Sequence, residues 1–514
     1  MSKKPLAIVR VPYLSMYNLL DVREEPIVSS LTEYLFSVGA NFEVFDFHLD
    51  RTLDTNTLVK FRADIYIICI RGTGLHWKYA LKISQHILLK TKARIIFYGQ
   101  TGKLQHWKNP DSERITTILH NEQAIGVELG LPRKGLSFGV DLTHYPYGLK
   151  YFDSLGARKN LFKATIETTR GCHFGCKFCF INHGKNYISR FTRQPVDNVI
   201  RDIQKYLEKG VNKFWFYDSE FIGGDKSHYP EVTELLTQLR DRFYGEIEIM
   251  IYNRADTLEN FGNYKLLADA GIKSILLGIE SLDDRDLKNM QKKQTSSIAL
   301  TAIKKLRDNS IFCNLSFILF NKTATIDSLQ TNISKIAELY NEDNFIYLGQ
   351  TIYFSYAFES DWSPSKQVKN LSRKTKLSGS TNSTVSPSMG ITFDPSLEPF
   401  AEICRIINYE QVRKLCELNL GKEDAMSDIK TKIHKWATLL NLFTLNLMQV
   451  ALDEFKLGRL TLETVQLYEK WVYTSYKDFN KLLLPHEIAD TITDKFGDFE
   501  GDWNGWESKI PTII

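Results

Sequence analysis

Three cysteines lie close together in one short segment of this 514-residue chain. Cys172, Cys176 and Cys179 follow a C-x3-C-x2-C spacing, and the aromatic residue Phe178 precedes the third cysteine. Each iron of a [4Fe–4S] cluster is normally held by one cysteine thiolate. Three thiolates therefore leave one iron without a protein ligand, and an open metal position can bind a substrate or cofactor. The spacing predicts an iron–sulfur site of this kind.

A structural zinc site is the alternative for the same residues. Such a site usually has four ligands and a second pair of cysteines. The remaining cysteines form no C-x2-C pair, since Cys69, Cys313, Cys404 and Cys416 are isolated. His173 adjoins the motif without a histidine partner at metal-ligand spacing. We therefore expect a cluster, and an iron–sulfur or zinc scaffold used only for binding is the alternative of another class.

Further motifs join the cysteines in resembling one superfamily. Residues 214–221 match a strand followed by acids, 252–256 contain Arg-x-Asp, and 277–282 contain Gly-Ile-Glu-Ser. Together they resemble the radical S-adenosylmethionine superfamily. In that superfamily the open iron chelates the amino and carboxylate groups of S-adenosylmethionine. One electron from the cluster then cleaves the sulfonium to a 5′-deoxyadenosyl radical.

The resemblance implies a role for each motif, beginning with the three cysteines as cluster ligands. The residues implied for S-adenosylmethionine are Asp218 and Ser219 (ammonium group), Arg254 (carboxylate), Glu280 and Ser281 (ribose hydroxyls), and Phe178 with the backbone of 317–319 (adenine). Structural roles stay open, because Asp218 and Glu280 could cap helices and Arg254 could pair with Asp256. Residues 317–323 lack the glycines and proline usual in the family at this point.

Apolar strands alternate with amphipathic helices over residues 161–360, which must position these motifs. The strands are expected at 164–168, 213–217, 246–252, 274–278, 312–320 and 345–354. In a β/α barrel, chemistry lies on the loops at the C-terminal ends of the strands, where the cysteines fall. The pattern predicts the partial (β/α)6 barrel of the superfamily.

The first 130 residues show the same alternation. Strands are expected at 6–11, 42–47, 65–70 and 94–98, with helices at 27–38 and 77–89. This order predicts a doubly wound parallel sheet, whose ligand binds at the carboxyl ends of the strands. Gly72 and Gly99 lie in turns there and would let a flat ring approach the backbone.

A unit of this kind before the cysteines resembles the cobalamin-binding domain of cobalamin-dependent radical enzymes. Residues 121–131 resemble the helix that bridges that domain to the barrel. The resemblance implies bound cobalamin, and a degenerate domain without corrin is the alternative. Asp46-Phe47-His48 looks like a cobalt-ligating motif, but it ends the second strand and Arg51 replaces the expected glycine. We expect His48 to be a surface residue and not a cobalt ligand.

The remaining segments complete the domain organisation. Residues 131–160 read as a linker, 361–395 as a loop rich in Ser, Thr and Lys, and 396–514 as a helical region. The net charge of +4 is too small to indicate nucleic acid or an anionic membrane as a partner. Odd, unpaired cysteines suit a reducing cytosol, and we find no signal peptide or spanning segment. We expect a cytoplasmic enzyme.

The implied function is a radical S-adenosylmethionine enzyme that also uses cobalamin. In that family a methyl group is transferred to an unactivated carbon of the substrate. The alternative is radical rearrangement, cyclisation or epimerisation without methyl transfer. We expect a small-molecule or peptide substrate and an external electron donor as partners.

Overall fold

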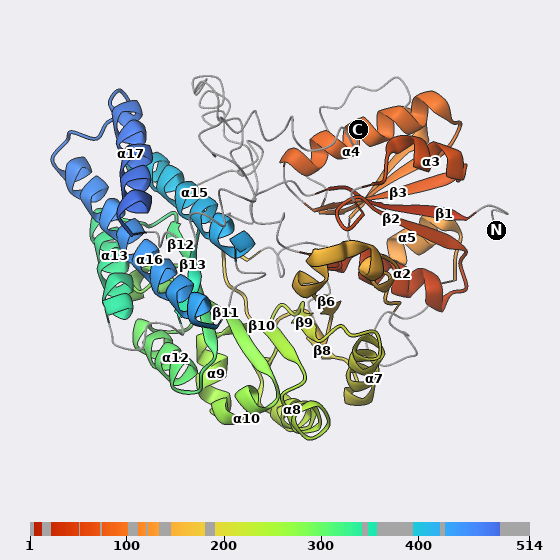
Figure 1. Cartoon of the computed structure of the whole chain (residues 1–514), viewed down its shortest axis with the longest axis horizontal. Coiled ribbons are helices and arrows are strands. Elements are labelled where there is room, and N and C mark those ends of the chain that lie inside the picture. The colour runs from red at the N-terminus through yellow and green to blue at the C-terminus, as the bar shows by residue number, and fades with distance from the viewer. Residues whose placement is uncertain are drawn as a thin grey trace.

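The structure is a computed structural model that describes residues 5–12, 22–50, 52–71, 74–100, 112–119, 122–132, 145–179, 191–341, 348–356, 394–421 and 427–483. Figure 1 shows an N-terminal α/β unit in red and orange, a second α/β unit in yellow and green, and C-terminal helices in blue. The expected α/β fold class with a helical C-terminal region is confirmed.

The N-terminal unit is a parallel sheet with strand order β2-β1-β3-β4-β5. Its strands are β1 (Leu6–Arg10), β2 (Phe42–Asp46), β3 (Ile65–Arg71), β4 (Arg94–Gln100) and β5 (Ile115–Leu119). This is a doubly wound order with its switch point between β1 and β3, where such sheets bind ligands. The sequence did not predict β5, a short edge strand with two threonines that lacks a continuous apolar run.

Helices cover both faces of this sheet. They are α2 (Pro26–Ser37), α3 (Thr55–Phe61), α4 (Gly74–Lys90) and α5 (Glu122–Leu129). Side chains alternate along each strand, so Ala7 and Val9 pack into one apolar core while Leu6 and Ile8 pack into another. The second core continues without a break into the barrel. The two α/β units are therefore joined by buried apolar contacts.

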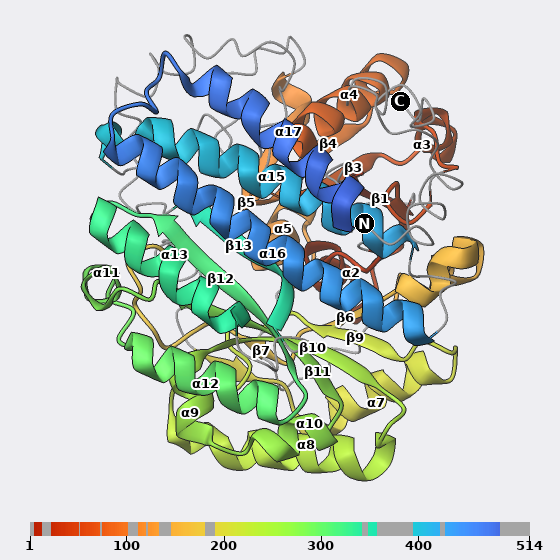
Figure 2. The ribbon, with the colours of Figure 1, turned by 60° about the vertical axis from the view of Figure 1, so that its left-hand side comes forward.

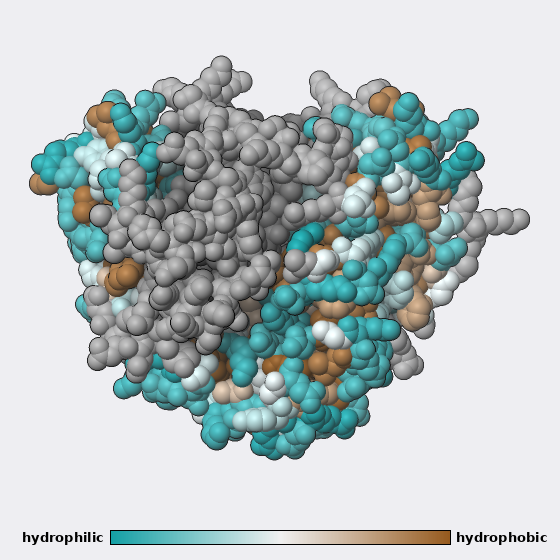
Figure 3. Space-filling view, viewed as in Figure 1, coloured by the Kyte–Doolittle hydropathy of each residue, from teal (hydrophilic) through white to brown (hydrophobic). Residues whose placement is uncertain are grey.

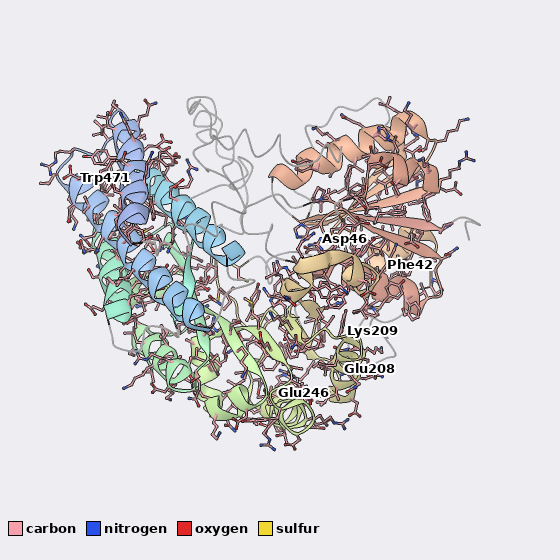
Figure 4. All side chains as sticks on the ribbon, in the orientation of Figure 1. Phe42, Asp46, Glu208, Lys209, Glu246 and Trp471 are labelled. Carbon is pink, nitrogen blue, oxygen red and sulfur yellow. The ribbon has the colours of Figure 1, made fainter. Side chains whose placement is uncertain are left out.

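The second unit is the expected open barrel of six parallel strands. The strands, in spatial order, are β6 (Ala164–Ile166), β9 (Lys213–Phe216), β10 (Glu248–Arg254), β11 (Ile272–Glu280), β12 (Phe312–Phe320) and β13 (Leu348–Tyr356). The outer helices are α7 (Val196–Leu207), α8 (Tyr229–Phe243), α9 (Ala255–Phe261), α10 (Tyr264–Asp269), α12 (Ser296–Asp308) and α13 (Ile326–Asn341). In Figure 4 the labelled Glu208, Lys209 and Glu246 mark the turns that lead into the strands. The candidate site lies at the opposite ends.

Three long helices lie side by side next to α13 and β13, as Figure 2 shows. They are α15 (Glu398–Gly421), α16 (Ser427–Lys456) and α17 (Val465–Leu483). Leu319 and Phe320 of β12 and Leu329 of α13 belong to the same apolar core as these helices. The C-terminal region therefore packs on the last strands of the barrel. The expected loop at 361–395 falls almost wholly outside the described residues.

Residues 131–132 and 145–160 of the expected linker at 131–160 are described, and the second stretch contains regular structure. It contains α6 (Leu149–Phe152) and the start of a 3-10 turn (Asp153–Leu161). The amide N–H groups of Gly148 and of Thr165 in β6 donate to the buried carboxylate of Glu24, over 2.7 and 3.1 Å. The Tyr206 hydroxyl of α7 donates to the same carboxylate over 2.6 Å. Glu24 thus ties three segments together.

No helix of the described part of the chain is long and apolar enough to span a membrane. In Figure 3 hydrophilic residues cover most of the visible described surface, and hydrophobic residues form only small patches.

Candidate functional site

The cysteine loop follows β6 at the C-terminal end of the barrel. A two-residue strand, β7 (Thr169–Arg170), pairs with β8 (Thr192–Arg193) and fixes the start of the loop. The Cys179 amide donates to the Cys176 carbonyl over 3.1 Å, and the Lys177 amide donates to the Met290 carbonyl over 3.0 Å. The loop is therefore a turn anchored to the segment after β11. Cys176 is buried, while Cys172 and Cys179 are partly exposed.

The three thiols are chemically suited to a metal group. None of them forms a disulfide. Burial raises the pKa of the Cys172 thiol to about 12, so its thiolate needs a compensating positive charge, which a coordinated metal supplies. Among the described residues, no group of three or more Cys, His, Asp or Glu side chains is arranged to hold a single metal ion. Cluster ligands bind different irons and so need not converge on one point.

Asp218, predicted to receive an ammonium group, is buried after β9. One of its carboxylate oxygens accepts from the amides of Thr168 and Thr169 over 2.8 and 2.7 Å, and the other accepts from the Thr168 hydroxyl. Burial raises the pKa of Asp218 to about 6, although these hydrogen bonds oppose the shift. Asp218 thus holds the segment that leads to the cysteines. Ser219 beside it is exposed.

Glu220 is a functional candidate that the sequence reasoning missed. Its carboxylate accepts from the Arg254 amide over 3.0 Å and from the Thr257 hydroxyl. Its side chain is buried, and burial raises its pKa to about 7, against the opposing effects of Thr257 and Arg254. The available signal was its spacing from Asp218, because alternate residues of an extended segment point to the same side.

Glu220→Gln should remove a pH dependence from the stability of the metal-free protein. The pKa of Glu220 is raised from 4.5, so the folded state holds its proton more tightly than the unfolded state. The contribution of Glu220 to the free energy of unfolding is therefore fully present below the pKa that it has in the unfolded state, and it is lost as the pH rises to about 7. We expect the loss between about pH 5 and pH 8 to shrink by about 3 kcal/mol in the variant, measured by urea unfolding. An equal loss in both proteins would contradict the shifted pKa.

Arg254 lies at the end of β10, directly beside the cysteine loop. Its guanidinium makes a bidentate pair with Asp256 over 2.8 and 2.7 Å, which is one of the two alternatives left open by the sequence. Its Nη1 also donates to the Cys176 Sγ over 3.2 Å. The guanidinium carbon lies 3.8 Å from the centre of the Phe174 ring. The sequence did not predict the contacts of Arg254 with Phe174 and Cys176.

Glu280, predicted to bind ribose, ends β11 in an unusual backbone conformation. Its φ is +68°, and the register of β11 against β12 shifts between Gly278 and Glu280. A positive φ in a residue other than glycine is uncommon and recurs at functional sites. The carboxylate of Glu280 pairs with the buried Lys292 ammonium over 3.0 Å. A side chain at Gly278 would meet both charged groups, so the glycine makes room for the pair.

Ser281, also predicted to bind ribose, is fully buried. Its hydroxyl accepts from the Asp283 amide over 3.0 Å and lies 3.2 Å from the Asn332 Oδ1. These contacts organise the start of α11 (Asp284–Asn289). Its contact with a ribose stays a prediction.

Phe178, predicted to pack on adenine, is partly buried in a small apolar cluster. Its partners there are Leu287, Met290 and Ile318, from α11, the turn after it and β12. Ile318 belongs to the stretch 317–319 whose backbone was predicted to line the adenine pocket. The structure therefore brings together these two predicted contributions, which are far apart in the sequence.

The expected cobalamin surface is described only in part. Gly72 lies outside the described residues. Gly99 has a φ of +129°, and a side chain there would overlap the Ile70 carbonyl. His48 is buried, so the expectation of a surface histidine was wrong, because the segment 153–161 packs against this turn and its Arg158 guanidinium donates to the His48 carbonyl over 3.3 Å. The His48 amide donates to the Asp46 carboxylate over 2.9 Å, and Figure 4 shows Asp46 next to the linker segment.

A partly buried charge network connects the N-terminal unit to the cysteine loop. Arg170, just before Gly171 and Cys172, pairs with Glu167 over 2.5 Å and with Glu122 of α5 over 3.4 Å. Burial alone would lower the pKa of Arg170, but the two carboxylates raise it well above its ordinary value. Residue Glu122 lies in the helix that the sequence predicted to bridge the two units. Helix α5 therefore contacts the start of the cysteine loop directly.

Comparison with known proteins gives one family and several relatives. Residues 166–336 match the radical SAM superfamily. Hopanoid C-3 methylase of Methylococcus capsulatus is 26% identical over 160 residues, which is 30% of this chain and 28% of the relative. Bacteriochlorophyllide d C-8(2)-methyltransferase of Chlorobaculum tepidum is 30% identical over 138 residues, 26% of this chain and 29% of the relative. The chain thus matches less than a third of the length of either relative.

One solved structure is similar over nearly the whole chain. The cobalamin-dependent S-adenosylmethionine radical enzyme OxsB, with aqua-cobalamin and S-adenosylmethionine bound, matches with a TM-score of 0.68. The match covers 96% of this chain and 84% of that chain at 15% sequence identity. At this identity the likeness is one of fold, and it includes the N-terminal sheet, the barrel and the C-terminal helices.

Proposed function

We propose that this chain, whose residues 166–336 match the radical SAM superfamily, is a cobalamin-dependent radical S-adenosylmethionine methyltransferase. The observation that carries the proposal is the direct contact between the doubly wound N-terminal unit and the cysteine loop. Arg170 and Glu122 make that contact. A corrin at the ligand-binding end of the first sheet must share a substrate with the cluster, so the two units have to be held in fixed relation.

The cofactors would supply the difficult chemistry when bound: one-electron cleavage of S-adenosylmethionine at the cluster and transfer of a methyl group from cobalamin. The chain would supply the cluster ligands Cys172, Cys176 and Cys179. Asp218 would hold the cysteine loop through Thr168 and Thr169, leaving the exposed Ser219 and nearby carbonyl groups to receive the ammonium group of S-adenosylmethionine.

The remaining binding residues would surround the nucleoside. Glu280 would accept hydrogen bonds from the ribose hydroxyls, with Ser281 and Lys292 fixing the strand end. Phe178 and Ile318 would contact the adenine in their apolar cluster. These apolar side chains would help to keep water away from the bound nucleoside, which would protect a reactive radical from side reactions.

The substrate is proposed to be a small molecule or peptide with an unactivated carbon that accepts the methyl group. The methyl-transfer relatives named above support methylation as the reaction class. An external one-electron donor would reduce the cluster.

Anaerobic reconstitution of the full chain with iron, sulfide and hydroxocobalamin tests the proposal. We expect about four irons per chain and a bound cobalamin spectrum, together with 5′-deoxyadenosine formed from S-adenosylmethionine. A His48→Ala control should leave the cobalamin spectrum unchanged. A protein that cleaves S-adenosylmethionine without retaining cobalamin would reject methyl transfer and favour a rearrangement, cyclisation or epimerisation.

Glu280→Gln tests the predicted nucleoside contact. The substitution keeps the shape of the side chain but removes the charge that pairs with Lys292 and replaces one of the two oxygens that would accept from the ribose hydroxyls by an amide donor. We expect S-adenosylmethionine binding to weaken by about 1–3 kcal/mol, or roughly five- to hundredfold. Iron content should stay equal to that of the wild type. Unchanged affinity in calorimetry would limit Glu280 to its ion pair with Lys292.

A further inference from the structure

We propose that Arg254 sets the reduction potential of the cluster by donating a hydrogen bond to the Cys176 thiolate. The proposal rests on the proposed [4Fe–4S] function of the three cysteines. Its geometric basis is the distance of 3.2 Å between the Arg254 Nη1 and the Cys176 Sγ. Hydrogen bonds to the sulfurs of iron–sulfur clusters are among the features that set their potentials.

Arg254 is held in this position from several sides. Asp256 binds its Nε and Nη2 in a bidentate pair. The Nη2 also donates to the Lys292 carbonyl, and the Phe174 ring lies against the face of the guanidinium. The whole residue is only 5% exposed. A side chain fixed in this way presents its Nη1 to the sulfur without reorganisation.

Most of the donors of Arg254 are already used. A guanidinium has five N–H donors. Hydrogen bonds to Asp256, to the Lys292 carbonyl and to Cys176 occupy four of them. One remains on Nη1, so the bidentate recognition of a methionine carboxylate would require the guanidinium to leave a partner that it already holds. This favours the sulfur over S-adenosylmethionine as the principal target of Arg254.

The electrostatic effect has a definite sign. A guanidinium stays protonated in proteins, so Arg254 places a positive charge beside the Cys176 sulfur. Reduction adds one electron from an external low-potential donor to the cluster, with no bond made or broken. A positive N–H group beside a ligating sulfur stabilises the more negative, reduced state, and burial strengthens the interaction. Removing Arg254 should therefore make the cluster harder to reduce.

The test is a reductive titration of reconstituted protein, followed by electron paramagnetic resonance. Arg254→Gln should lower the equilibrium constant for reduction about tenfold, which is about 59 mV for a one-electron couple. Arg254→Lys keeps the charge and should give a smaller decrease. Arg193→Gln is the matched control, because Arg193 is also buried near the loop but donates to the carbonyls of Phe221 and Ile222. Its potential should equal that of the wild type.

A second measurement avoids substitution at a buried arginine. Wild-type protein labelled with ¹⁵N only in arginine should show ¹⁵N hyperfine coupling to the reduced cluster. No coupling, or an Arg254→Gln cluster of full iron content with the wild-type potential, would overturn the inference while leaving the proposed function intact. Loss of S-adenosylmethionine affinity at an unchanged potential would reassign Arg254 to the cofactor carboxylate. A wild-type protein that forms no cluster would reject the proposed function itself.

Discussion

Cys176→Ala should abolish the iron–sulfur cluster and with it all cleavage of S-adenosylmethionine. Cys176 is the buried member of the three cysteines, and its sulfur is the one that Arg254 contacts. Without it a cluster would retain only two protein ligands, and the Arg254 Nη1 would lose the sulfur that it contacts while the pair with Asp256 stays in place. The bound iron, measured by iron and sulfide analysis after desalting, should fall from about four atoms per chain to nearly none.

Cys404→Ala is the matched control for this substitution. Cys404 is an equally buried cysteine of α15, in the apolar core of the C-terminal helices. Its removal should leave iron content and S-adenosylmethionine cleavage at the wild-type level. Stable zinc without charge-transfer absorbance in the wild-type protein would contradict the cluster and support the zinc scaffold instead.

Arg170→Met should strongly destabilise the protein even before any cofactor is added. The substitution leaves the carboxylates of Glu167 and Glu122 near each other without their shared cation. Burial already raises the pKa of Glu167, and Arg170 is the group that opposes this shift. Breaking a fully buried ion pair from one side costs about 3–5 kcal/mol, and the cost falls where the groups are partly exposed, as the Arg170 and Glu167 side chains are at 15% and 25%. We expect a loss of about 2–3 kcal/mol in the free energy of unfolding, measured in urea at neutral pH.

Two further variants distinguish the loss of this charge network from the general effect of removing an arginine side chain. Arg201→Met is the control, because the Arg201 side chain is 49% exposed and should change stability by less than about 0.5 kcal/mol. Adding Glu122→Gln and Glu167→Gln to Arg170→Met should recover part of the loss, since no unpaired buried charge remains. A triple variant no more stable than Arg170→Met would refute the electrostatic explanation.

The sequence by itself predicted an iron–sulfur chemistry and determined the layers of this protein. The spacing of Cys172, Cys176 and Cys179 is local, and its meaning depends on thiolate chemistry alone. The strands of both sheets are short apolar runs, and the alternation with helices predicted parallel sheets that the structure confirms. The open six-stranded barrel with the cysteines after its first strand also followed from order along the chain. The weakly apolar edge strand β5 and the short helix α3 were not predicted.

The tertiary structure decided which polar groups face each other. Arg254 and Cys176 are 78 residues apart, and Tyr206 and Glu24 are 182 residues apart. No sequence period links such pairs, because their contact depends on how parallel strands and loops are brought together at one end of the barrel. The same is true of Glu280, whose partner Lys292 lies beyond a helix, and of Glu122, which reaches Arg170 from the other unit. Burial then fixed the pKa of Glu220, because the cost of charging a carboxylate depends on what surrounds it in space.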